Sequence, residues 1–211
     1  MLRYLQRSKT IRTGSLIILS FLLLTGFIGC HPTIPKEGFS VIGKLSESQL
    51  DELAPNKSLI KYYIDYPKEL VKSTCTGSTA FAVPVELPLG LALKDAISEG
   101  LINSFKVSQD NFRYSVIINI SSISSTHEFS GGGKGMDQGS LSTKIIIQIF
   151  DPNGKSLYEK TQDNQETLDI SDRKTFSHPA VIFDELAGKT AVKTVKNISR
   201  TINRIERQSS N

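Results

Sequence analysis

Two segments in the second half of the chain alternate apolar and polar residues in the way that a half-buried β-strand requires. In residues 112–122 the first face carries Tyr114, Val116, Ile118 and Ile120; in residues 141–151 it carries Leu141, Thr143, Ile145, Ile147 and Ile149. Side chains along a strand point alternately to opposite faces. The two segments therefore predict paired, β-branched strands that cover one face of a sheet with a hydrophobic layer.

The opposite face of this pair is mostly polar, but three large apolar residues interrupt it: Ile117, Ile146 and Phe150. Exposed singly, such residues need no explanation. On paired strands they would form one patch, bordered by Lys144, Gln148 and Asn119. Such a patch, together with the loop 129–139, is typical of a partner-binding surface. The alternative is that residues 58–67, which have an apolar face of their own, bury it.

Further strands are expected on both sides of this pair. Asp151-Pro152-Asn153-Gly154 predicts a tight turn, and residues 155–161 then return as a shorter strand in an antiparallel meander. Residues 60–66 alternate as a strand that Pro67 ends. In residues 79–87, Pro84 cannot donate to a ladder, so this strand should lie at an edge or contain a break.

Two long segments have helical rather than strand periodicity. Residues 89–105 carry an apolar stripe, and Gly100 on that stripe suggests close approach to a sheet. Residues 179–207 form the second helix, with Ser177 or His178 as its cap and basic residues on its solvated face. A membrane-lying helix is a minor alternative for this segment. The element order predicts an α+β fold: a two-layer sandwich with a mostly antiparallel sheet of four to five strands and two long helices on one face.

The amino-terminal 29 residues have the order of a bacterial export signal. Four basic residues (Arg3, Arg7, Lys9 and Arg12) precede an apolar run over residues 15–29, and no acid accompanies them. A membrane span needs about 20 apolar residues, so this run is short for an uncleaved anchor. An ordinary signal peptide is the other alternative.

The sequence Phe27-Ile28-Gly29-Cys30 resembles the lipobox of bacterial lipoproteins, although that family usually has Leu where this chain has Phe27. The resemblance implies that the Cys30 sulfur takes a diacylglycerol, that the chain is cut before it, and that the new amino terminus is acylated. His31, rather than an aspartate, follows the cysteine. By resemblance to the sorting rule of enteric bacteria, this implies an outer-membrane lipoprotein, which we expect to face the periplasm.

Cleavage changes the meaning of the composition. The precursor has 25 Lys and Arg against 21 Asp and Glu, but four of those bases lie in residues 1–29, so the mature chain has 21 of each. A neutral chain removes the argument for nucleic acid as a partner. Residues 30–57 are then expected to be the lipid anchor and flexible tether, residues 58–207 a single α+β domain, and residues 208–211 a disordered tail. Residues 46–53 would form a short helix capped by Ser46, and Cys75 remains as an unpaired cysteine.

No motif in the chain predicts catalysis. The run 131–135, GGGKG, lacks the spacing of a phosphate-binding loop and joins two strands. The three histidines, His31, His127 and His178, are far apart and lack partners at metal-ligand spacing. We therefore expect no enzyme activity, no metal and no cofactor.

The element order together with Cys30 resembles small periplasm-facing envelope lipoproteins. These include the YajG-like lipoproteins, the lipopolysaccharide-assembly lipoprotein that plugs its partner barrel, and auxiliary lipoproteins of ABC-type transport systems. The resemblance covers about residues 78–206 and implies a non-catalytic protein that binds another envelope protein during assembly or transport. The alternatives are a carrier or sensor of a small or lipidic ligand held between sheet and helices, and an enzyme with a convergent site.

Overall fold

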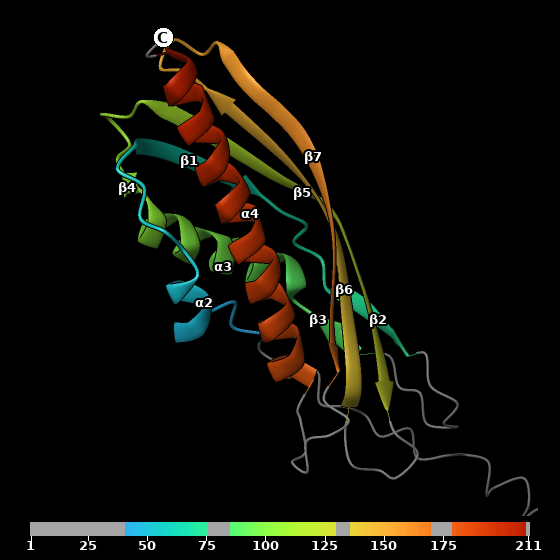
Figure 1. Ribbon diagram of the computed structural model, residues 1–211. Helices are drawn as coiled ribbons and strands as arrows, with labels where there is room; N and C mark the ends of the chain where they lie inside the picture. Colours follow the sequence, from blue (N-terminus) through green and yellow to red (C-terminus); the bar gives the residue numbers. More distant parts are fainter. Residues whose placement is uncertain (1–40, 76–84, 130–135, 170–178, 210–211) are drawn as a thin grey trace, which may run out of the picture. The chain divides into compact units, whose positions relative to one another are not determined.

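The computed structural model describes residues 41–75, 85–129, 136–169 and 179–209 (Figure 1). These residues form an α+β fold. Its elements are α2 (Glu47–Asp51), β1 (Leu59–Asp65), β2 (Val71–Cys75), β3 (Val85–Leu87), α3 (Leu89–Ser104), β4 (Lys106–Val107), β5 (Tyr114–Phe129), β6 (Met136–Phe150), β7 (Ser156–Asp169) and α4 (Pro179–Ser209).

The expected meander is confirmed, with longer strands than predicted. β5 pairs antiparallel with β6, which pairs antiparallel with β7. Ile118 lies opposite Ile147, so the two apolar rows share one face of the sheet. The turn between β6 and β7 is held by the Asp151 carboxylate, which accepts hydrogen bonds from the backbone N–H groups of Asn153 and Lys155, and Gly154 has a φ of +81°.

The rest of the sheet corrects the expected architecture. In the described residues the sheet has seven strands rather than four to five. Its long pairings, β5 with β6 and β6 with β7, are antiparallel, but shorter parallel pairings make the sheet mixed. β1 and β2 both run parallel to β5, along the edge of β5 that β6 does not occupy. β1 pairs with the start of β5 and β2 with its end, so the two follow one another along one edge. The parallel direction arises because the chain passes through α3 between β1 and β5.

A β-bulge in β5 changes which residues face the helices. Ile120 pairs with Ile145 and Ser122 with Lys144, which leaves Ser121 as the additional residue. Before the bulge the even-numbered residues are buried; after it Ser125 and His127 are buried. Of the strand predicted over residues 79–87, only residues 85–87 are among the described residues. They form β3, which pairs antiparallel with β2.

The helices bury one face of the sheet, and Figure 1 shows α4 crossing it. Fully buried side chains fill the layer between them: Ile60, Leu93, Ile97, Ile118, Ile145, Ile147, Phe183 and Leu186. Gly100 does not face the sheet as expected. A Cβ there would lie 3.0 Å from Val195 Cγ2, so this glycine allows α3 to approach α4. Instead Gly139 of β6 gives the close approach to a sheet, because its Cβ would lie 2.6 Å from Ile182 Cγ2 of α4.

The segment before β1 belongs to the packed unit. Val41 and Leu45 are buried, and Ser46 and Gln49 form a capping box at the start of α2. The Gln49 side chain donates to the Glu185 carbonyl at 3.2 Å, in the space that Gly188 leaves beside α4. Packing therefore begins before residue 58, where we expected the domain to start. At the other end α4 continues to Ser209, so residues 208 and 209 of the expected tail 208–211 are helical.

Candidate functional site

The candidate site is the face of the sheet opposite α3 and α4, which we call the open face. Four apolar side chains meet there. Tyr63 of β1 pairs with Ile117 of β5, and Ile117 pairs with Gln148 of β6. Phe150 and Ile146 occupy the positions on either side of Gln148 along β6, each diagonal to Ile117. Ile117 is thus at the centre of a patch formed by Tyr63, Ile117, Ile146 and Phe150.

The structure brings together the residues predicted for this surface. Ile117, Ile146, Phe150 and Gln148 are half-buried, and Lys144 is exposed. The alternative, burial of the patch beneath residues 58–67, is wrong. Residues 59–65 form β1, which lies beside β5 in the same sheet and extends the open face. The loop expected over residues 129–139 is also shorter, since β6 begins at Met136; residues 130–135 lie outside the described residues.

Tyr63 is the residue of this surface that the sequence analysis missed. Its side chain is 62% exposed, the most exposed of the four. Alternation in residues 60–66 already placed Tyr63 on the face of the strand that does not carry Ile60 and Ile64. Only the parallel pairing of β1 with β5 puts it next to Ile117. The missing information was the strand order, which alternation does not contain.

Two polar residues at the border of the patch are bound to acids of β7. The Gln148 amide donates to Glu159 Oε2 at 2.9 Å, and Lys144 Nζ lies 4.0 Å from Asp163 Oδ1. The Lys144 pair is exposed, so it contributes little to stability. The border therefore offers both signs of charge around an apolar centre, which is the usual composition of a protein-binding surface.

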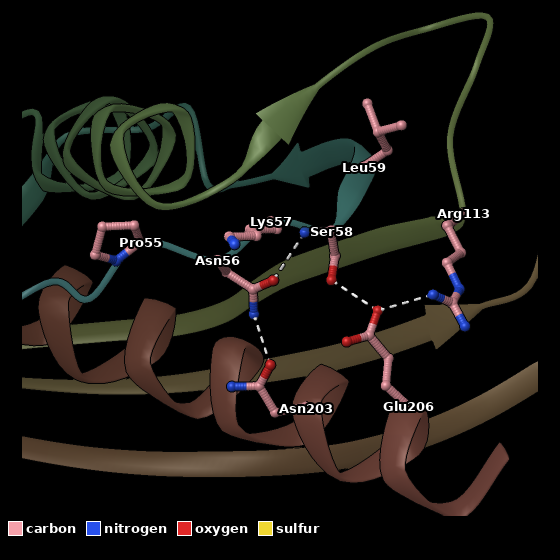
Figure 2. A pocket seen from close by; sticks show the side chains of 8 residues that line it. All are labelled: Pro55, Asn56, Lys57, Ser58, Leu59, Arg113, Asn203 and Glu206. Atoms are coloured by element: carbon pink, nitrogen blue, oxygen red, sulfur yellow. Dashed lines mark hydrogen bonds and ion pairs between the residues drawn. The ribbon is translucent and has the colours of Figure 1, made fainter. Parts of the chain in front are cut away.

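Apart from the open face, the structure has a hollow with a volume of about 590 Å³ (Figure 2). It is lined by residues 55–59, by Arg113 and by the carboxyl-terminal part of α4. Its polar side chains bind one another. Glu206 Oε1 accepts from Ser58 Oγ at 2.9 Å and from Arg113 Nη1 at 3.2 Å. Asn56 Nδ2 donates to Asn203 Oδ1 at 3.1 Å. These bonds fasten the start of β1 to α4, which is a structural role.

One buried pair superficially resembles a catalytic dyad. Ser73 Oγ of β2 lies 2.8 Å from Nδ1 of His127 on β5. Both residues are almost fully buried, with 0% and 1% exposure, so a substrate would have no access to the hydroxyl. The pair links β2 to β5.

Several sequence predictions lie outside the described residues. They include lipidated Cys30, the run 131–135, and the caps Ser177 and His178. β2 ends at Cys75. Within the described ranges, no three His, Cys, Asp or Glu side chains are grouped as metal ligands, and no helix combines the length and apolar character of a membrane span.

The sequence matches no protein-family model and no curated protein. Among solved structures, a protein from Xanthomonas campestris described by the family DUF330 is 10% identical, with a TM-score of 0.47 over 74% of this chain and 95% of that one. A minor lipoprotein from Acinetobacter baumannii is 12% identical, with a TM-score of 0.38 over 71% and 95%. Rare lipoprotein B from Shewanella oneidensis is 9% identical, with a TM-score of 0.36 over 72% and 99%. These likenesses are too distant to establish a shared family or function.

Proposed function

We propose that this protein is a lipid-anchored cell-envelope protein that assists assembly or transport by binding another envelope protein through its open face. The anchor is the acylated Cys30, in the outer membrane and facing the periplasm. The support for the anchor is the order of basic residues, apolar run and Gly29-Cys30 at the amino terminus.

The patch on the open face carries the binding part of the proposal. A tyrosine that is 62% exposed stands beside Ile117, with Ile146 and Phe150 on the neighbouring strand. A partner that covers these side chains would remove apolar surface from water without any rearrangement of the strands. In many interfaces a few residues contribute most of the binding energy, and tyrosine is common among them.

A ligand carrier is the second candidate, and the packing gives it less support. A carrier needs space between sheet and helices. In the described residues that layer contains side chains with 0% exposure, including Ile118, Ile147 and Phe183. We favour binding over catalysis for a related reason, because the polar side chains of the hollow in Figure 2 are bonded to one another.

The anchor is tested by mass spectrometry of protein extracted from membranes. We expect an amino-terminal Cys30 that carries diacylglycerol and an additional acyl chain, and we expect Cys30→Ser to accumulate as unprocessed precursor. Cleaved, soluble protein with an unmodified Cys30 would refute the anchor.

The binding surface is tested by site-specific photocrosslinking in intact cells. A photoreactive phenylalanine analogue at Tyr63 should give one dominant adduct with an envelope protein, and Ile117→Ser should abolish it. The same analogue at Ile102 is the control, because Ile102 is 58% exposed but lies on α3. Adducts of equal identity and yield from both positions would show that the open face is not selective.

A further inference from the structure

A second group of exposed apolar side chains lies on segments that meet near the amino-terminal ends of α3 and α4. Its members are Ile42, Leu70, Leu91 and Val181, with exposures of 65%, 56%, 43% and 58%; we call them the apolar cap. They come from four separate segments of the chain. Contacts between residues next to them in the sequence connect these segments. The cap is distinct from the open face because none of its residues lies on β1, β5, β6 or β7.

The backbone around residue 42 holds the cap together. The N–H groups of Ile42 and Gly43 donate to Asp184 Oδ1 at 2.8 and 3.0 Å, one turn of α4 beyond Val181. Gly43 has a φ of +66°, and a Cβ there would meet the backbone of Ala92, next to Leu91. A Cβ on Gly90 would likewise meet the Pro67 carbonyl, three residues before Leu70.

These contacts explain why Ile42 remains exposed. Both N–H groups are bonded to one carboxylate, and Gly43 lies against α3, so the backbone that sets the direction of the Ile42 Cα–Cβ bond is held in place. The exposed isoleucine is thus held outward by the fold.

The chain length between the anchor and the cap limits what can cover it. Twelve residues separate Cys30 from Ile42 by sequence number, which corresponds to about 40 Å when fully extended and to about 20 Å on average for a flexible chain. With Cys30 in the bilayer, the cap is the exposed apolar surface nearest to the lipid along the chain. Ile102, near the carboxyl-terminal end of α3, and Val107 in β4 have no such short connection to the anchor.

We propose that the apolar cap docks onto the lipid surface, so that the anchored domain rests on the bilayer at this end. The inference depends on the lipidation of Cys30 proposed above. Aliphatic side chains enter the boundary between headgroups and acyl chains, and the tether supplies a high local concentration of membrane, so a small patch suffices. Lys44, Lys68 and Lys72 near the cap are exposed, but so are Glu69 and Glu86. Docking should therefore not require anionic lipid.

The chain contains no tryptophan, so one introduced tryptophan reports its own surroundings. The full chain carrying Leu91→Trp is expressed with its leader, extracted, and reconstituted into phosphatidylcholine vesicles with brominated acyl chains. Emission at position 91 should shift to the blue and be quenched by the bromine. Replacing half of the lipid by phosphatidylglycerol with the same brominated acyl chains should leave the quenching unchanged.

Ile102→Trp is the matched control. It lies eleven residues further along α3, on nearly the same side of the helix and about 16 Å away along its axis. Its emission should be the same on brominated and unbrominated lipid. If Leu91→Trp lowers the thermal stability, Val181→Trp replaces it, with the same expected quenching.

The outcomes separate the cap from the anchor, because the mass of Cys30 is measured on the same samples. Acylated protein without quenching at positions 91 and 181 overturns the cap and leaves the anchor intact. Equal quenching at positions 91 and 102 overturns it too, since α3 would then lie along the membrane. A blue shift without quenching would mean that a protein or a second copy covers the cap, which also overturns it. Unmodified Cys30 overturns the premise.

Discussion

The two faces of the sheet use the same strands, the same alternation and the same residue types, yet they differ in what covers them. On the helix-covered face Ile118, Ile145 and Ile147 have no exposed surface. On the open face Ile117 and Ile146, their neighbours in sequence, are only half-buried, and Tyr63 is 62% exposed. The difference shows that alternation sorts side chains onto two faces without determining which face is covered.

The two faces also differ in how much stabilisation their apolar residues contribute. Complete burial of an isoleucine side chain stabilises a fold by about 1.5–3 kcal/mol. A half-buried one gains only part of this, because its remaining surface stays in water. On the open face that remaining stabilisation is available to a partner, whereas on the helix-covered face α3 and α4 already use it.

The largest difference between the faces is expected for a buried charge. Ile118→Asp or Ile147→Asp places an unpaired carboxylate in the apolar layer and should reduce the free energy of unfolding by more than about 4 kcal/mol, which leaves little folded protein. Ser121→Asp, at the exposed bulge, should change it by less than about 0.5 kcal/mol. Urea unfolding and soluble yield measure both. Equal tolerance of the three substitutions would mean that the assigned strand register is wrong.

A smaller but still selective effect is expected where α4 approaches the sheet. Gly139→Val forces its side chain against Ile182 and should destabilise the protein by about 1–3 kcal/mol, measured by urea unfolding. Ser142→Val makes the same kind of change on the open face of β6 and should be neutral or slightly stabilising, since β-branched residues suit strands. A neutral Gly139→Val would show that α4 can shift away from β6 at little cost.

On the open face we expect a substitution to affect partner binding more than the stability of the fold. Ile146→Ser should lower the free energy of unfolding by no more than about 1 kcal/mol and yet remove the Tyr63 crosslink. Lys155→Ser, in the turn after β6, is the control and should change neither. A variant that keeps full stability and full crosslinking would show that the patch is incidental.

The smallest effect concerns pH. Burial raises the pKa of Tyr114, on the covered face, above its ordinary value of 10.0, so the folded state keeps a proton that the unfolded state loses near pH 10. Stability from this residue is complete below pH 10 and decreases as the pH rises through the raised pKa. Tyr114→Phe should therefore flatten the fall in the urea midpoint as the pH rises above about 10. An unchanged slope would mean that other groups dominate alkaline unfolding.

Much of the fold could be predicted because it depends on local patterns. The apolar rows of β5 and β6, the turn at Gly154, the stripes of α3 and α4 and the cap at Ser46 all follow from spacing and residue type. The carboxyl-terminal half of β5 could not be recognised, because residues 121–128 are mostly polar and the bulge at Ser121 reverses the alternation.

The strand order and the site required long-range information. Residues 59–65 look the same whether they lie beside β5 or over the sheet, so the sequence did not distinguish a longer open face from a buried one. The grouping of Ile117, Ile146 and Phe150 was predictable from the hairpin register alone. The addition of Tyr63 was not, because it depends on parallel pairing across 54 residues of chain.

That parallel pairing also affects the order in which the protein can fold. Ile60 pairs with Tyr114, whereas β5, β6 and β7 are consecutive along the chain. Contacts between nearby residues form sooner than contacts that close long loops. The meander should therefore assemble before β1 joins it, although β1 is synthesised first. During that interval the edge of β1 that pairs with β5 stays open, beside the apolar Ile60 and Ile64, and can pair with other chains instead. The risk of aggregation is thus greatest before β1 has paired with β5.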